Sequence, residues 1–310
     1  MTVAFTFPGQ GSQAVGMGKE LAESSPESAR VFDEVDDALG EKLSKLIWEG
    51  PDDQLTLTAN AQPALMAVSM AAIRAMEARG LVLSQKASFV AGHSLGEYSA
   101  LCAAGVFSVA ETARLLRIRG NAMQNAVPVG QGAMAAIIGL EQADVEAACV
   151  EAGECQIAND NGGGQLGISG GKQGVEKAME ICSGKGAKRA LLLPVSAPFH
   201  STLMAPAADA MREALAEVEA NAPSVPIVAN VLAAPVSDPA EIKDRLVEQV
   251  TGRVRWRETV EWFGANGVTS MYEIGAGKVL SGLARRIDRG LTTASVGTPA
   301  DIDAALSSLA

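Results

Sequence analysis

A serine between two glycines carries the clearest chemical signal in the sequence. Gly92 to Gly96 spell G-H-S-L-G, between an apolar run at 87–91 and a helical pattern that ends near Gly105. The glycines permit a sharp turn that would hold the Ser94 hydroxyl above a strand end, facing the backbone N–H groups that begin the helix. The alternative is a glycine-bounded loop that contains a serine by chance. This alternative is disfavoured, because the strand and the helix both fall where a nucleophile elbow needs them. The pattern therefore predicts a nucleophile elbow.

A serine hydroxyl needs a base to become nucleophilic at neutral pH, and histidine is the usual one. The chain has two histidines, His93 and His200. Adjacent turn residues rarely bring their side chains to the ~2.6–3.2 Å that proton transfer requires, which disfavours His93 as the partner of Ser94. A lone histidine is more often structural than catalytic. His200 is nevertheless the remaining candidate for the base that activates Ser94. No acidic residue stands out as the third member of a triad.

Arg119 gives a clue to the charge of the substrate. Ser108 and Glu111 form a capping box that begins a helix, and Arg119 falls on the helix face that carries Leu115 and Leu116. An arginine there can snorkel to the surface or pair with a core carboxylate. It can also await the carboxylate of a substrate, because a buried guanidinium without a counter-charge is costly. Geometry alone supports a structural role and a substrate-binding role for Arg119 equally.

Two glycine motifs raise the question of nucleotide binding. Gly9, Gly11 and Ala14 match G-x-G-x-x-A, but Pro8 interrupts the junction and no acid stands at a second strand end, so a dinucleotide-binding module is disfavoured. The same turn could instead supply a backbone N–H to an oxyanion hole. The segment around Lys172 does not complete a P-loop.

Composition narrows the class of protein further. The 310 residues carry a net charge of -11, which argues against nucleic acid or an anionic membrane as a non-specific partner. The four cysteines and two histidines show no metal-ligand spacing, so we expect reduced thiols and no metal. The N-terminus lacks the plan of a secretory signal, and the alanine-rich stretch 64–78 is too short to cross a bilayer. A cytoplasmic location is the resulting expectation.

The elements that must position these residues follow an α/β pattern. Apolar runs at 3–7 and 87–91 predict buried strands, each followed by glycines and a helical pattern. Pro63 and Gly80 would begin and end another helix. Helices are also expected at 206–219 and 241–250, and a strand at 270–273. Alternating strands and helices of this kind indicate an α/β sheet.

From residue 128 the pattern changes. Strands are expected at 133–138, 156–158, 165–169 and 189–195, with helices at 142–152 and 172–183. The order β-α-β-β-α-β is that of a ferredoxin-like unit. We therefore predict an inserted small domain at 128–197 and a large domain built from 1–127 and 198–310.

Several motifs together resemble those of malonyl-CoA:acyl carrier protein transacylases and of the acyltransferase domains of fatty acid and polyketide synthases. The likeness spans essentially the whole chain. Its motifs, in order, are F-P-G-Q-G-S-Q at 7–13, Q-P-A-L at 62–65, G-H-S-L-G at 92–96, R-G-x-x-M at 119–123 and F-H at 199–200. In combination they are highly specific.

The resemblance implies an α/β-hydrolase-like large domain with a ferredoxin-like insert, and it assigns roles to individual residues. The implied catalytic residues are Ser94 as nucleophile, His200 as general base and Gln249, whose main-chain carbonyl orients His200. The implied oxyanion hole consists of the backbone amides of Gln10 and Leu95. The implied substrate-binding residues are Arg119, which holds the malonyl carboxylate, and Met123, Asn159 and Phe199.

The resemblance also implies malonyl-CoA and the phosphopantetheine of acyl carrier protein as substrates, with no bound cofactor, and we expect a monomer. The carrier is acidic in this family, so an acidic chain needs local cations to receive it. Two short runs qualify: Lys185, Lys188 and Arg189, and Arg285, Arg286 and Arg289. Short charge runs are more often ordinary solvated surface. A serine thioesterase or hydrolase, and an acyltransferase of polyketide synthesis, remain as alternatives.

Overall fold

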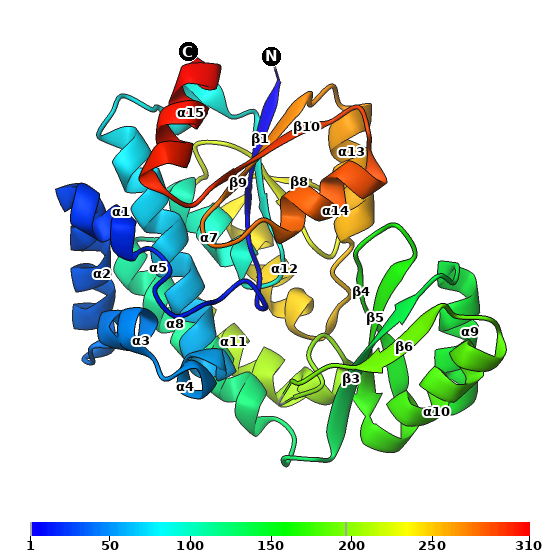
Figure 1. Cartoon of the computed structure of the whole chain (residues 1–310). Helices are drawn as coiled ribbons and strands as arrows, with labels where there is room; N and C mark the ends of the chain where they lie inside the picture. Colours follow the sequence, from blue (N-terminus) through cyan, green and yellow to red (C-terminus); the bar gives the residue numbers. More distant parts are fainter. Residues whose placement is uncertain (1, 196) are drawn as a thin grey trace.

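Two β-sheets organise the chain, and the computed structural model describes residues 2–195 and 197–310 (Figure 1). The larger sheet has the strand order β10-β9-β1-β2-β7-β8, and its neighbours pair in parallel except β7 and β8. Its strands are β1 (Val3–Phe7), β2 (Phe89–Gly92), β7 (Ile227–Ala229), β8 (Ala234–Val236), β9 (Ser270–Ile274) and β10 (Thr292–Val296).

Helices cover both faces of this sheet, as the apolar strands require. Along β1, Phe5 and Phe7 enter one apolar core while Ala4 enters another, which contains Trp256 and Phe263. The helices of the large domain are α1 (Lys19–Ser24), α2 (Pro26–Leu39), α3 (Leu43–Glu49), α4 (Asp52–Thr56), α5 (Thr58–Glu77), α6 (Leu83–Lys86), α7 (Gly96–Ala103), α8 (Val109–Asn125), α11 (Ala205–Ala216), α12 (Pro239–Thr251), α13 (Trp256–Ala265), α14 (Val279–Ile287) and α15 (Pro299–Leu309), with a 3₁₀ turn at Thr202–Met204. Helices α5 and α8 lie on one side of the sheet, and α13 and α14 on the other (Figure 1). Within the described ranges, no helix combines the length and apolarity that a membrane span needs.

The smaller sheet has the order β4-β5-β3-β6 and is antiparallel throughout. Its unit runs β3 (Gly132–Ile138), α9 (Gln142–Ala152), β4 (Cys155–Asp160), β5 (Gln165–Gly171), α10 (Lys172–Gly184) and β6 (Arg189–Leu192). Alternation along β3 places Ala135 and Ile137 in the core with α9 and α10, while Met134 faces the large domain. The predicted fold class, a large α/β domain with a ferredoxin-like insert, is confirmed.

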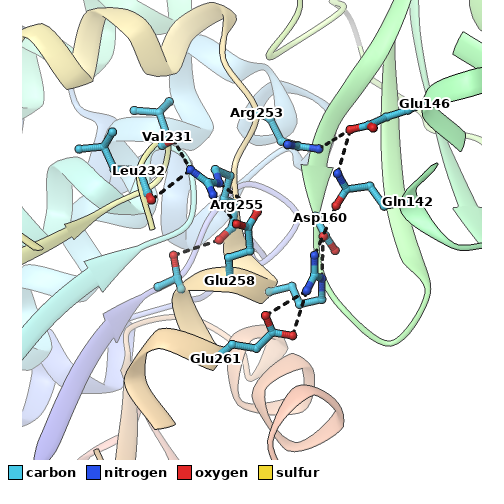
Figure 2. Close-up of polar contacts among 11 residues, drawn as sticks. Gln142, Glu146, Asp160, Val231, Leu232, Arg253, Arg255, Glu258 and Glu261 are labelled. Carbon is cyan, nitrogen blue, oxygen red and sulfur yellow. Dashed lines mark hydrogen bonds and ion pairs between the residues drawn. The ribbon is translucent and has the colours of Figure 1, made fainter. Parts of the chain in front are cut away.

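Strand β4 joins the small sheet to the large domain. The backbone of Val254 accepts from Asp160 N–H at 3.0 Å and donates to the Ala158 carbonyl at 2.9 Å. Charged side chains around Val254 reinforce this junction: Arg253 contacts Glu146 at 2.9 Å, and Arg257 contacts Asp160 at 2.8 Å (Figure 2). We propose the domain boundaries at 127/128 and 197/198, outside the first and last strands of the small sheet.

Several sequence-based element boundaries are wrong, and three of them have an identifiable cause in packing or in the backbone. Helix α5 begins at Thr58, so Pro63 lies inside it. Pro63 lies in the second turn and removes one backbone donor, while Gly120 of α8 packs so closely on the first turn that a Cβ at Gly120 would lie 2.6 Å from the Ala59 Cα. The helix therefore extends in the N-terminal direction because of packing.

The two strand errors also have backbone causes. Strand β2 begins at Phe89 rather than at 87, because the Ala87 N–H closes α6 by bonding to the Leu83 carbonyl. Strand β6 ends at Leu192 rather than at 195, because Pro194 has no N–H to continue the ladder. Strands β7, β8 and β10 were not predicted.

Candidate active site

Ser94 occupies a strained turn between β2 and α7. Its φ of 53° lies in the left-handed region, the hallmark of a nucleophile elbow. A Cβ at Gly92 would lie 1.9 Å from the carbonyl carbon of Gly96, and one at Gly96 would lie 2.2 Å from the Phe7 carbonyl oxygen. Both flanking positions must therefore be glycine for the turn to form beside β1.

His200 lies against the serine although 106 residues separate them. Its Nε2 is 2.7 Å from Ser94 Oγ. On the other side of the ring, Nδ1 lies 2.9 Å from the Gln249 carbonyl oxygen and 3.2 Å from that of Gly252. Carbonyl oxygens only accept hydrogen bonds, so Nδ1 carries the proton and the lone pair of Nε2 faces the hydroxyl. Main-chain carbonyls thus occupy the place that a triad carboxylate would take.

The surroundings keep this imidazole neutral. Burial, together with the nearby Arg119 charge, lowers the pKa of His200 to about 3. A neutral imidazole can accept a proton at neutral pH. His93 is held elsewhere, with its Nε2 2.9 Å from Asn161 Oδ1 and its ring against Trp256.

Arg119 is only 1% exposed, which excludes snorkelling. Its guanidinium donates to Ser94 Oγ at 3.1 Å, to Gln249 Oε1 at 2.8 Å and to Gln62 Oε1 at 2.7 Å. No ion pair with a carboxylate and no partner for Nε is found among the described residues. The core-carboxylate alternative is therefore excluded there: the buried guanidinium donates to neutral oxygens and lies over the Tyr98 ring, 5.6 Å from its centre.

Two glutamines orient their oxygens toward this cation. Gln62 Nε2 donates to Thr58 Oγ1 at 3.0 Å, which leaves its Oε1 for Arg119. Gln249 Nε2 donates to the Ser94 carbonyl at 2.9 Å and to Glu97 Oε2 at 2.8 Å, which leaves its Oε1 likewise. The guanidinium is thus positioned by amides that do not neutralise its charge.

Two polar residues beneath the elbow were missed by the sequence analysis. Asn230 accepts from Ser94 N–H at 2.8 Å and donates to the Gly92 carbonyl at 2.7 Å. Buried Glu97 accepts from Asn230 N–H at 3.2 Å, and desolvation raises its pKa to about 7. An asparagine directly after the apolar triplet 227–229 was the available signal, since polar residues at the carboxyl ends of parallel strands commonly line sites.

The remaining expected residues border one cavity of about 340 Å³ between the two sheets. It is lined by Ser94, His200, Arg119, Gln10, Leu95, Met123, Asn159 and Phe199, together with Met134 and 193–195 from the small domain. Gln249 is not among the lining residues, but it contacts two of them, Arg119 and His200. The backbone N–H groups of Gln10 and Leu95 have no protein acceptor in the described part of the chain and are free to bind an anion.

The site combines a serine in hydrogen-bond contact with a neutral histidine, two backbone N–H groups and a buried cation. These groups suit attack on a carbonyl, stabilisation of the resulting oxyanion and binding of a negatively charged acyl group. The fold and the site therefore define an acyl-transfer enzyme.

Comparison with known proteins narrows this class. The acyl transferase domain family matches residues 4–286. The chain is 46% identical over 311 residues to a malonyl CoA-acyl carrier protein transacylase of Bacillus subtilis (strain 168), covering 99% of this chain and 97% of the relative. It is similar to a crystal structure of an acyl-carrier-protein-S-malonyltransferase from Bartonella henselae, with a TM-score of 0.98 and 65% identity over 100% of this chain and 99% of the other.

A second solved structure is a malonyl-transacylase in complex with its type II PKS acyl-carrier protein. It has a TM-score of 0.96 and 42% identity, covering 99% of this chain and 100% of the other. The chain belongs to the acyl transferase family and, within it, to the malonyl CoA-acyl carrier protein transacylases. This confirms the family predicted from the motifs.

Proposed function

We propose that this enzyme transfers a malonyl group from malonyl-CoA to the phosphopantetheine thiol of acyl carrier protein, through an ester on Ser94, and that it supplies fatty acid synthesis. The buried Arg119 guanidinium, 3.1 Å from the nucleophilic oxygen, carries this conclusion. In a malonyl group, one methylene separates the thioester carbonyl from the free carboxylate. A carbonyl placed at Ser94 Oγ would therefore bring that carboxylate to the guanidinium.

In the first half-reaction, the Ser94 hydroxyl gives its proton to His200 Nε2 as Oγ attacks the thioester carbon. The backbone N–H groups of Gln10 and Leu95 stabilise the oxyanion. When the tetrahedral intermediate collapses, the carbon–sulfur bond breaks and His200 returns the proton to the departing CoA thiolate. The products of this step are the malonyl ester and free CoA.

The second half-reaction reverses these steps. His200 takes the proton of the phosphopantetheine thiol, whose sulfur attacks the malonyl ester, and the Ser94 oxygen leaves with that proton. Malonyl-CoA and the carrier thus react in turn at one serine, which gives ping-pong kinetics. Both enter as substrates, so no resident cofactor is needed, and we propose that the enzyme acts as a monomer in the cytoplasm.

A serine hydrolase is the main alternative, because water could take the place of the thiol. A hydrolase would normally orient its histidine with a carboxylate, whereas His200 faces two carbonyl groups. A hydrolase of uncharged acyl groups would also have no use for a buried cation in contact with its nucleophile. Both observations favour transfer of an acidic acyl group.

Arg119→Ala tests the substrate. It should depress malonyl transfer relative to acetyl transfer by about 1.5–3 kcal/mol in transition-state free energy, the usual value of a hydrogen bond to a charged group. The measurement is kcat/KM for malonyl-CoA and acetyl-CoA in parallel. Arg117→Ala is the matched control, because Arg117 lies on the same helix and pairs with Glu41 away from the cavity. An equal loss for both substrates would make Arg119 structural.

For the carrier, we propose docking on the two exposed cation runs, Lys185, Lys188 and Arg189, and Arg285, Arg286 and Arg289. One backbone hydrogen bond and two side-chain contacts support the proposal by bringing the runs toward one turn, Gly162–Gly164. The Lys188 side chain covers Gly139, the Gly139 N–H bonds to the Gly164 carbonyl at 2.9 Å, and Arg286 lies beside Gly163. The turn directly follows Asn161, whose side chain contacts His93 in the cavity wall. An acidic carrier on this surface would lie next to the cavity.

Charge reversal at Lys188 and Arg189, or at Arg286 and Arg289, should raise the KM for carrier protein and flatten its dependence on salt, because rim charges act mainly on association. The KM for malonyl-CoA should change less. Initial rates at low and high ionic strength measure both constants. Reversal of Lys19 and Lys45, on α1 and α3, is the control of equal charge. Unchanged carrier kinetics in both double variants at low salt would place docking elsewhere.

A further inference from the structure

Gln156 of β4 reaches from the small domain to the backbone around the catalytic histidine. Its Nε2 donates to the His200 carbonyl at 3.3 Å and to the Thr251 carbonyl at 3.2 Å. Its Oε1 accepts from Thr202 N–H at 3.0 Å. One side-chain amide therefore connects the segment that carries His200 with the segment that orients it.

The His200 backbone needs such support. Its φ of 56° lies in the left-handed region, which is unfavourable for a residue with a Cβ and persists where surrounding contacts hold it. The two carbonyl groups that accept from Nδ1 belong to Gln249 and Gly252, on either side of Thr251. Gln156 thus holds the histidine and its acceptors at a fixed separation.

Strand β4 is itself firmly anchored to the large domain. Two backbone hydrogen bonds join Ala158 and Asp160 to Val254, and Arg257 contacts the buried Asp160 carboxylate at 2.8 Å. Gln156 lies two residues before the first of these contacts and does not line the cavity. Its position is therefore determined by the domain junction and not by bound substrate.

From these contacts we propose that Gln156 is a positioning residue for His200, so that the seating of the small domain determines the alignment of the base with Ser94. The proposal rests on the assigned role of His200 and goes beyond it. Removing the Gln156 contacts should slow attack by Ser94 without weakening substrate binding.

The test uses two variants. Gln156→Leu removes all three hydrogen bonds, whereas Gln156→Glu keeps the shape and the acceptor for Thr202 N–H but loses both donors. The single-turnover rate of Ser94 acylation by malonyl-CoA should fall about tenfold or more in each, a part of the full contribution of a positioned base. The dissociation constant for malonyl-CoA should stay within about twofold, and the acid limb of the pH–rate profile should move up towards the ordinary histidine value of 6.5.

Gln142→Leu is the matched control. Gln142 is also a glutamine of the small domain at the same junction, where it contacts Glu146 at 2.8 Å and Arg257 at 3.3 Å. It has no contact with the backbone around His200. A general loosening of the junction would slow this variant as much as Gln156→Leu, and that result would overturn the proposal. So would a wild-type acylation rate in Gln156→Glu.

A fluorophosphonate probe separates this proposal from the identity of the substrate. It reacts with a histidine-activated serine whatever the natural acyl group, and the Ser94 oxygen displaces fluoride while His200 takes the proton. Slower labelling of both Gln156 variants, but not of Gln142→Leu, would support the positioning role. Equal labelling rates in all variants would refute it. A wild-type protein that reacts with the probe but not with malonyl-CoA would refute the proposed function alone.

Discussion

Malonyl-CoA alone should leave one malonyl ester on the wild-type protein, and Ser94→Ala should abolish it. The first half-reaction needs no carrier, and without the thiol the ester has no acceptor other than water. Intact mass spectrometry detects the adduct, and peptide mapping locates it. Addition of carrier protein with its phosphopantetheine should then discharge the ester and transfer the mass to the carrier.

Ser99→Ala is the matched control for this experiment. Ser99 is buried in α7, one turn beyond the elbow, and its hydroxyl has no hydrogen-bond partner in the part of the chain that the structure describes. That variant should keep the adduct. A malonyl group found on a cysteine, or retained in Ser94→Ala, would rule out the serine mechanism.

His200→Ala should slow acylation of Ser94 by a factor on the order of 10²–10⁴, the usual contribution of a positioned general base. The Ser94 hydroxyl would lose its 2.7 Å contact with Nε2 and would keep only the Arg119 guanidinium, which cannot accept a proton. Single-turnover kinetics with malonyl-CoA measure the loss. Added imidazole should restore part of the rate by entering the space that the side chain leaves.

The pH dependence of the wild-type enzyme provides a second check. A His200 pKa of about 3 leaves the imidazole of the free enzyme neutral throughout the range around neutral pH. The kcat/KM for malonyl-CoA should therefore show no histidine limb between about pH 5 and pH 8, the range in which an unperturbed histidine titrates. A limb near 6.5, or unchanged acylation in His200→Ala, would contradict the assigned role.

The sequence alone determined those features that depend on neighbouring residues. Gly92 and Gly96 are required by contacts within the turn and with β1, so the elbow could be predicted from the motif and the apolar run before it. Hydrophobic periodicity placed Arg119 on the buried face of α8, and it predicted the element order of the small domain. These predictions succeeded because turn chemistry and amphipathic periodicity act over a few residues.

Tertiary structure decided everything that depends on distant partners. The sequence could not decide whether Arg119 forms an ion pair in the core or is available to bind a substrate anion. That decision required the neutral oxygens of Gln62 and Gln249, which lie 57 and 130 residues away in the sequence. Resemblance pointed to the Gln249 carbonyl as the support of His200, but nothing local indicated Gly252, Asn230 or Gln156. Such contacts form where strands and loops from both domains meet, and the periodicity within one segment does not determine which distant segments it contacts.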